Sequence, residues 1–294
     1  MPLRIVQSKQ NARLKELRRA LAHPGHEGCL AGIEGPNLLG EALSARLRIR
    51  CVFAAQGSEH LLDELDLAPE TEVLLMPREL LTSALATETP QPIAALVEPP
   101  RWIWRDMLEG GVDGENKAGP LVVVLAGLQD PGNLGTILRS AEAFGATGVV
   151  SLPGTVSAWN PKAVRASAGS VFRVPILSAT ADECFTRLRE VRVKILATAL
   201  RETQPAGRAH LASPVAFLIG NEGNGVPEEL AAQADGSVTI PCPGPVESLN
   251  AAVAASILLY EASRQRAGQE TITTQPSQNA RRTGHPHSLI GGLR

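Results

Sequence analysis

The chain has 294 residues, of which 44% are hydrophobic and 20% are charged, a composition typical of globular proteins and unlike that of disordered chains. Its 28 basic and 30 acidic side chains give a formal charge of −2, which excludes a uniformly basic nucleic-acid coat but still allows a local basic patch. Aromatic residues make up only 3% of the chain, so we do not expect nucleic acid to be bound on a platform of stacked aromatic rings.

Residues 1–105 are predicted to form a small α/β domain. Leucines at helical spacing predict one helix around 14–21 and another over 38–47, and Pro77 is expected to begin a third because proline suits the first turn of a helix. Strands are predicted in three apolar runs, at 49–55, 72–76 and 93–97.

Residues 106–119 are rich in glycine and acidic residues, so we expect a linker there. A second α/β domain is predicted over 120–265, because the apolar run 121–128 is typical of a strand buried on both faces in a parallel sheet. Amphipathic helical stretches alternate with further predicted strands at 148–152, 193–198, 215–219 and 237–240. The polar tail 266–294 is predicted to be disordered.

The cysteines predict neither a zinc site nor a disulfide framework, because none forms a CxxC pair or accompanies a histidine cluster. They are Cys29, Cys51, Cys184 and Cys242, and we expect them to be isolated buried thiols. The N-terminus has no apolar signal segment, and the longest apolar runs are too short to cross a bilayer. We therefore expect a cytoplasmic protein without metal and without a membrane partner.

The first of three motifs in the second domain is Asp130-Pro131-Gly132-Asn133-Leu134-Gly135, which follows the 121–128 strand and opens a helix that ends at Gly145. Free N–H groups at the start of this helix favour an anionic group such as a phosphate. Arg139 lies off the apolar stripe, so it can point toward a ligand. A turn with an ordinary surface arginine is the alternative, and the GxGxxG spacing of a dinucleotide-binding loop is absent.

The second motif is FLIGNEGNGVP at 217–227, a hydrophobic strand that continues into a loop with three glycines. Such a loop lets the backbone approach a ligand closely. Glu222 lies at the carboxyl end of the strand, where open α/β sheets bind ligands. The alternative is a plain turn into a helix over 227–233.

The third motif is IPCPGPVESLN at 240–250, followed by an alanine-rich helix. Three prolines stiffen the loop, and Ser248 is expected to cap the helix. Alone, this motif favours a capped core helix after a rigid loop.

In this order and spacing the three motifs resemble the SpoU (TrmH-like) family of RNA ribose 2′-O-methyltransferases, within the SPOUT superfamily. The resemblance covers 120–263. It extends more weakly into 1–97, where SKQNARLKELRRAL and AGIEGPNLLGEAL look like the family's ribosomal-protein-like substrate-binding domain. It implies a deep trefoil knot in the second domain, a feature that periodicity does not predict. It also implies a homodimer with the alanine-rich helix in its interface.

The resemblance implies that S-adenosylmethionine (AdoMet) is the cofactor, bound in the knot. The residues expected to contact it are Thr198, Ala199, Leu218, Gly220, Ile240 and Leu249. The residues expected at the catalytic site are Asn133, Arg139, Glu222, Ser248 and Asn250. The short polar side chains are expected to orient the ribose or a phosphate, and Glu222 to hold either Arg139 or a loop. Arginine is a poor base, so phosphate binding and stabilisation of the developing alkoxide suit Arg139 better than deprotonation.

RNA contacts are expected from Arg13 and Lys15 in the basic first helix, and from Arg165 and Ser167 in a segment similar to one on the RNA side of the family's cleft. For Lys162, in the same segment, a solvated position is an equal alternative. The chain departs from the family pattern at residues 90–92, Pro-Gln-Pro, and in the proline-rich loop 242–247. Both departures are expected to affect RNA contacts more than chemistry.

The preferred prediction is methylation of a ribose 2′-hydroxyl in structured RNA, with 23S ribosomal RNA favoured over tRNA because a module of this kind more often accompanies rRNA methylation. A catalytically silent RNA-binding or assembly factor on the same fold is the alternative from another class. The intact catalytic positions disfavour it. A nucleotide-dependent oxidoreductase is disfavoured by the missing GxGxxG loop.

Overall fold

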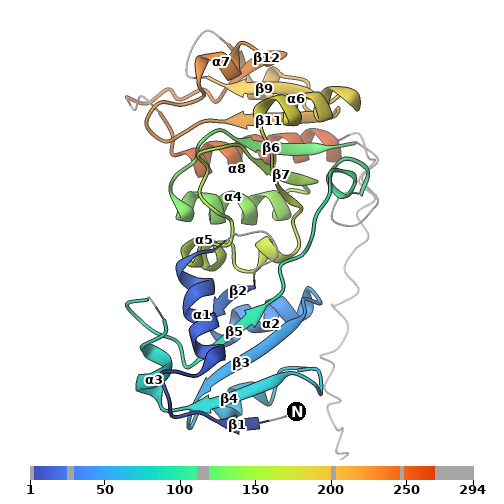
Figure 1. The fold of residues 1–294 in the computed structure, drawn as a ribbon. Coiled ribbons are helices and arrows are strands. Elements are labelled where there is room, and N and C mark those ends of the chain that lie inside the picture. The colour runs from blue at the N-terminus through green and yellow to red at the C-terminus, as the bar shows by residue number, and fades with distance from the viewer. Residues whose placement is uncertain are drawn as a thin grey trace, which may run out of the picture.

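The computed structural model describes residues 3–24, 30–85, 87–110, 119–199, 203–245 and 248–268, and it contains two sheets (Figure 1). We call residues 3–97, which hold the five-stranded sheet, the N-terminal unit. We call residues 121–268, which hold the seven-stranded sheet, the C-terminal unit. Helix α5 lies between the two, packed on α4 of the C-terminal unit and touching β2 of the N-terminal unit.

The N-terminal unit is a mixed sheet in the order β1-β4-β3-β5-β2. Its strands are β1 (Leu3–Ile5), β2 (Ala31–Glu34), β3 (Ile49–Ala55), β4 (Glu72–Met76) and β5 (Ile93–Val97). Its helices are α1 (Ala12–Ala22), α2 (Pro36–Ser44), the short 3₁₀ turn η1 (Glu59–Leu62) and α3 (Arg78–Thr82). Side chains alternate along β3, so Phe53 packs in the same cluster as α1 while Val52 packs in the cluster of α2. The three predicted strands are confirmed with the predicted bounds.

The C-terminal unit is a parallel sheet in the order β10-β12-β9-β11-β6-β7-β8. Its strands are β6 (Leu121–Leu125), β7 (Gly148–Ser151), β8 (Ile176–Ser178), β9 (Lys194–Thr198), β10 (Gln204–Pro205), β11 (Val215–Ile219) and β12 (Gly236–Thr239). Its helices and 3₁₀ turns are α4 (Pro131–Ala143), α5 (Pro161–Ala166), η3 (Ser170–Phe172), α6 (Ala181–Glu190), η4 (Ala206–Arg208), α7 (Glu228–Ala231) and α8 (Ala251–Ala267). The predicted parallel α/β sheet is confirmed.

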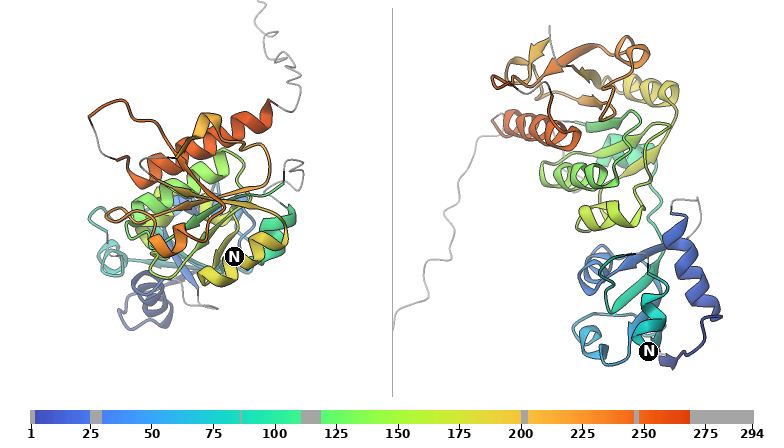
Figure 2. Two further views of the ribbon diagram at one scale, coloured as in Figure 1. Left: turned by 90° about the horizontal axis from the view of Figure 1, so that it is seen from above. Right: turned by 90° about the vertical axis from the view of Figure 1, so that its left-hand side faces the viewer.

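Helices cover both faces of the seven-stranded sheet. The buried residues of α4 and α8 belong to one core cluster and those of α6 to another, and Figure 2 shows α4 and α8 side by side. Helix α4 ends as predicted, with Gly145 in the left-handed conformation at φ 71°. Because all seven strands run in the same direction, their carboxyl ends form one edge of the sheet.

Two stretches expected to be irregular are ordered where the structure describes them. Asp106–Gly110, in the expected linker, form a π-helical turn whose Met107 is completely buried. Residues 111–118 lie outside the described part. Arg266, assigned above to the tail, belongs to α8. Its guanidinium donates to four backbone carbonyls, those of Gly119 at 2.8 Å, of Pro120 and Ser213 at 3.0 Å and of Leu211 at 3.4 Å, which anchors the helix end. Residues 269–294 also lie outside the described part.

The described cysteines differ from one another. Cys51 and Cys184 are buried, and burial raises the pKa of each thiol to about 12, so both are poor nucleophiles. Cys242 is exposed, against our expectation, because it lies in the loop between β12 and α8. Cys29 lies outside the described residues. In the part of the chain that the structure describes, no helix is long and apolar enough to cross a membrane, and no three metal-ligating side chains gather.

Candidate active site

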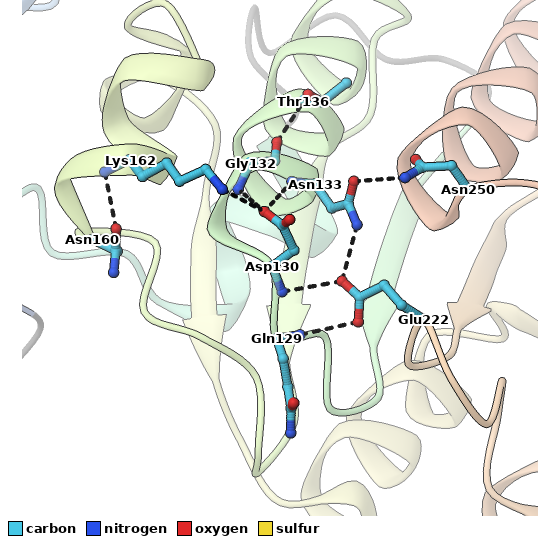
Figure 3. A network of polar contacts seen from close by, with 9 residues as sticks. All are labelled: Gln129, Asp130, Gly132, Asn133, Thr136, Asn160, Lys162, Glu222 and Asn250. Atoms are coloured by element: carbon cyan, nitrogen blue, oxygen red, sulfur yellow. Dashed lines mark hydrogen bonds and ion pairs between the residues drawn. The ribbon is translucent and has the colours of Figure 1, made fainter. Parts of the chain in front are cut away.

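A hydrogen-bonded network at the carboxyl edge of the seven-stranded sheet joins the three motifs (Figure 3). Asn133, in the first turn of α4, donates from Nδ2 to Oε1 of Glu222 at 3.0 Å. Asn250 donates from Nδ2 to Oδ1 of Asn133 at 3.0 Å. Three of the five predicted catalytic side chains, one from each motif, therefore lie in contact although 117 residues separate Asn133 from Asn250.

Glu222 holds a loop rather than an arginine. Besides Asn133, its carboxylate accepts hydrogen bonds from the backbone N–H groups of Gln129 at 3.3 Å and Asp130 at 3.1 Å, in the loop after β6. Partial burial alone would raise the pKa of Glu222, but the hydrogen bonds from Asn133 and from backbone N–H groups outweigh it and lower the pKa below 4.5. Glu222 is therefore ionised at neutral pH and acts as an acceptor.

Asn250, and not Ser248, caps α8. Its Oδ1 accepts from the N–H groups of Ala252 at 2.9 Å and Val253 at 3.2 Å, which leaves Nδ2 to bind Asn133. The expectation for Ser248 was wrong because the helix begins at Ala251, and the capping residue must directly precede the first helical residue. Ser248 is exposed two residues before the cap.

The carboxylate of Asp130 supplies a negative charge at the start of α4. Asp130 accepts from the backbone N–H groups of Gly132 at 2.5 Å and Asn133 at 3.4 Å, and these bonds, the one from Gly132 first, lower its pKa. We expected these N–H groups to be free for a phosphate, and the structure corrects this expectation: Asp130 occupies them. Lys162 lies 3.4 Å from Asp130, so its charge is also locally paired.

Arg139 lies apart from this network. It is exposed on α4 and makes no hydrogen bond or ion pair within the described residues. A separation of six residues turns its side chain about 120° around the helix from that of Asn133. Of the two roles considered for Glu222, holding Arg139 has no support in this geometry.

Five of the six expected cofactor residues lie at the carboxyl ends of β9, β11 and β12, and the sixth, Leu249, directly precedes the capping residue of α8. Thr198 donates from Oγ1 to the Leu218 carbonyl at 3.0 Å. The Leu218 side chain is completely buried in the core cluster that also contains the buried residues of α6, so this side chain does not line a cleft. Ala199 donates its N–H to the carbonyl of Val238 at 3.0 Å. Ile240 and Leu249 are half-buried.

Gly220 is the most constrained of these residues. A Cβ on it would lie 1.9 Å from the carbonyl carbon of Gly225, because the loop folds back through two hydrogen bonds between Asn221 and Gly225. Gly220 is buried, and its N–H has no acceptor within the described residues. Such a donor can bind an acceptor atom of a ligand. Together with the half-buried apolar side chains nearby, it fits the adenosine part of AdoMet.

The expected RNA-contacting residues are distributed over both units. Lys15 is exposed. Arg13 is paired with Glu16 at 2.9 Å and Glu72 at 3.2 Å, so less of its charge is available than expected. Arg165 lies 3.8 Å from the buried Glu34 of the N-terminal unit. Ser167 is completely buried and donates to the Val164 carbonyl at 2.8 Å, so the expected RNA contact of its side chain is not available in this structure.

Sequence reasoning missed Asn221 and the structural role of Asp130. Asn221 donates from Nδ2 to the Gly127 carbonyl at 2.9 Å and so ties the loop after β11 to the loop after β6. Its position between the strand and the glycines of the second motif was an available signal. For Asp130, the signal was the Asp-Pro start of a helix.

Two family models match this chain. The model described as "SpoU rRNA Methylase family" matches residues 120–260, and the one described as "RNA 2'-O ribose methyltransferase substrate binding" matches residues 33–103. Among curated relatives, RlmP of Bacillus subtilis, named a 23S rRNA (guanosine(2553)-2'-O)-methyltransferase, is 30% identical over 258 residues, 87% of this chain and 97% of that protein. RlmB of Xanthomonas campestris, named a 23S rRNA (guanosine-2'-O-)-methyltransferase, is 36% identical over 60% of this chain and 72% of its own length.

Solved structures agree with these matches. An AdoMet-bound rRNA methyltransferase from Sinorhizobium meliloti has a TM-score of 0.76 at 30% identity, and the match covers 89% of this chain and 98% of that one. The SpoU methyltransferase AviRb from Streptomyces viridochromogenes, solved in complex with AdoMet, has a TM-score of 0.73 at 26% identity, over 88% of this chain and 99% of that one. The expected family is therefore confirmed, and so is the expected mixed α/β fold with a parallel sheet, over nearly the whole described chain.

Proposed function

The chain belongs to the SpoU rRNA methylase family, and we propose that it transfers a methyl group from AdoMet to a ribose 2′-hydroxyl of 23S ribosomal RNA. Curated relatives named as 23S rRNA methyltransferases support rRNA over tRNA. The observation that carries the proposal is the network of Asn133, Glu222 and Asn250 beside Gly220. The network offers polar side chains that can hold a ribose, and Gly220 offers a backbone N–H that can bind a cofactor. Such an enzyme would work in the cytoplasm, where bacterial ribosomes are made.

AdoMet would supply the electrophilic methyl group, held at the carboxyl ends of β9, β11 and β12 by Gly220, Ile240 and Leu249. The protein must then hold the 2′-hydroxyl in line with that methyl group. Asn133 uses one N–H for Glu222 and one oxygen lone pair for Asn250, and it keeps one N–H and one lone pair for a ribose. Glu222 fixes the loop after β6 that leads into α4, the helix that carries Asn133.

Two further site roles are part of the proposal. Arg139, exposed on α4, binds the phosphate next to the target ribose and stabilises the developing alkoxide. Ser248 lies exposed at the mouth of the site and contacts the RNA. Lys15 and Arg165 are retained as RNA contacts on the two units.

We also propose the finer features of the family fold. Residues 1–105 would bind RNA and residues 120–265 would carry the reaction, with the C-terminal segment of the second domain threaded through a loop as a deep trefoil knot. A homodimer through α8 is supported by its exposed apolar stripe, Val253, Ile257 and Tyr260, at i, i+4 and i+7. The Tyr260 ring packs edge-on against Phe144 of α4, which joins both helices into one surface.

The direct test is to map ribose methylation in RNA from a strain that lacks the gene. Loss of one 2′-O-methyl group in 23S rRNA, restored by the wild-type gene and not by an Asn133→Ala variant, supports the proposal. Loss of a tRNA methyl group with unchanged rRNA would overturn the rRNA assignment. Unchanged RNA of both kinds would favour a silent RNA-binding factor.

A further inference from the structure

A large cavity separates the two units. Its volume is about 1280 Å³, larger than the 300–1,000 Å³ of common small-molecule pockets. Arg13 and Arg50 line it from the N-terminal unit, residues 98–102 from the connecting segment, and Ser151, Ser178 and residues 155–159 from the C-terminal unit. A space of this size between two units suits a segment of a polymer better than a small ligand.

The cavity lies on the same edge of the sheet as the candidate active site. Ser151 and Ser178 are the carboxyl-terminal residues of β7 and β8, which follow β6 in the strand order. Neighbouring strands lie about 4.8 Å apart, so β8 is about 10 Å from β6. The loop after β7 is also bonded to the loop after β6, since the N–H of Val156 donates to the carbonyl of Leu128 at 2.8 Å. A chain in the cavity can therefore continue into the active site.

The mouth of the cavity carries surplus positive charge. Arg48 and Arg50 lie 3.7 Å and 3.4 Å from the same carboxylate, that of Glu98. Arg101 is exposed and has no ion-pair partner within the described residues. Two guanidinium groups thus share one carboxylate and a third has none, which favours a polyanion.

Trp102 adds an unused donor to this wall. Its ring is half-buried, and its Nε1 is inaccessible to solvent and has no hydrogen-bond partner among the described residues. Buried indole N–H groups usually have an acceptor. The Nε1 atom is closed to the cavity, but the residue lines it, and its ring offers a face for a base.

Ion pairs also join the two units. Arg173 binds Glu41 of α2 at 2.7 Å and also pairs with Glu142 of α4. Arg165 and Glu34 form a second contact between the units at 3.8 Å. These contacts restrict movement between the units, which lowers the ordering cost of RNA binding.

We propose that this cavity binds the single-stranded RNA segment that adjoins the methylated nucleotide. Arg50 and Arg101 contact its phosphates, and the Trp102 ring stacks on one of its bases. The inference rests on the proposed function and names the part of the substrate that enters between the units.

The test measures binding of an unmethylated 23S rRNA transcript by the full chain at several salt concentrations. The Arg50→Ala/Arg101→Ala double variant is expected to bind about tenfold more weakly and to lower the slope of log K against log salt by about 1.4, or about 0.7 for each lost phosphate contact. Trp102→Ala is expected to weaken binding without changing the slope, because it removes the ring but no charge. Arg78→Ala is the matched control, since Arg78 is exposed at the opposite edge of the five-stranded sheet.

Methyl transfer separates this inference from the proposed function. The double variant is expected to bind AdoMet like the wild type and to show a raised KM for RNA with kcat unchanged. If the double variant has the affinity, salt slope and KM of the wild type, the inference is overturned. The proposed function stands in that case as long as the wild-type protein transfers methyl groups. A peptide paired with the free edge of β8 would then be the better occupant of the cavity. Absence of any methyl transfer by the wild type would instead overturn the proposed function.

Discussion

Asn133 donates its side-chain N–H to Glu222 at 3.0 Å, across 89 positions of sequence. Turning the Asn133 amide over would set its oxygen against the Glu222 carboxylate and its N–H group against the N–H of Asn250. The amide orientation is therefore fixed from both sides before any substrate binds. Preorganisation of this kind is what a positioning site requires.

Glu222→Gln should lower methyl transfer by at least about tenfold. The glutamine keeps the shape, but its NH₂ group faces N–H donors of Gln129, Asp130 or Asn133, so the loop after β6 loses an acceptor. Steady-state kinetics with AdoMet and rRNA measure the effect. Glu229→Gln, an exposed change on α7, is the control and should match the wild type. Equal activity in both variants would contradict this role of Glu222.

Two different substitutions of Asn250 can separate its role as the cap of α8 from its hydrogen bond to Asn133. Asn250→Asp keeps an oxygen that caps α8 but removes the donor to Asn133, so activity should fall while thermal stability stays near that of the wild type. Asn250→Ala removes both contacts and should also lower the free energy of unfolding by about 1 kcal/mol. Ser248→Ala should leave stability unchanged. Thermal melts with kinetics on the three variants test this, and a destabilised Ser248→Ala would restore Ser248 as the cap.

Gly220→Ala should abolish AdoMet binding. The added methyl group would overlap the backbone at Gly225, which must move away. Gly207→Ala is the matched control because nothing lies within 4 Å of a Cβ built there. Calorimetric titration with AdoMet compares the two variants. Unchanged affinity in Gly220→Ala would remove Gly220 from the cofactor site.

The lowered pKa of Glu222 predicts that acid reduces the stability of the folded protein. Because the folded pKa lies below the ordinary value of 4.5, the stabilisation by ionised Glu222 is fully present above 4.5 and is lost as the pH falls through the folded pKa. Urea unfolding between neutral pH and about pH 3 should show a smaller acid-induced loss in Glu222→Gln than in the wild type. The same loss in both proteins would show that the Glu222 carboxylate does not contribute.

The sequence predicted the elements better than the contacts. The continuous apolar run at β6 and the leucine spacing of α1 each satisfy one local rule, so both were found. The expectations for Ser248 and for the N–H groups of α4 failed because a capping residue is chosen by where the helix starts, which tertiary packing decides. Likewise, the contact of Glu222 with Asn133, and not with Arg139, depends on how three distant loops meet at one edge.

The central claim is that this chain methylates a ribose 2′-hydroxyl in 23S rRNA through the site around Asn133. The most direct measurement is transfer of labelled methyl groups from AdoMet to unmethylated 23S rRNA, with the labelled nucleotide mapped by its resistance to alkaline cleavage. We predict one labelled ribose with the wild type and none with Asn133→Ala at unchanged AdoMet affinity. Label on tRNA alone, on a base, or at equal levels with both proteins would contradict the account.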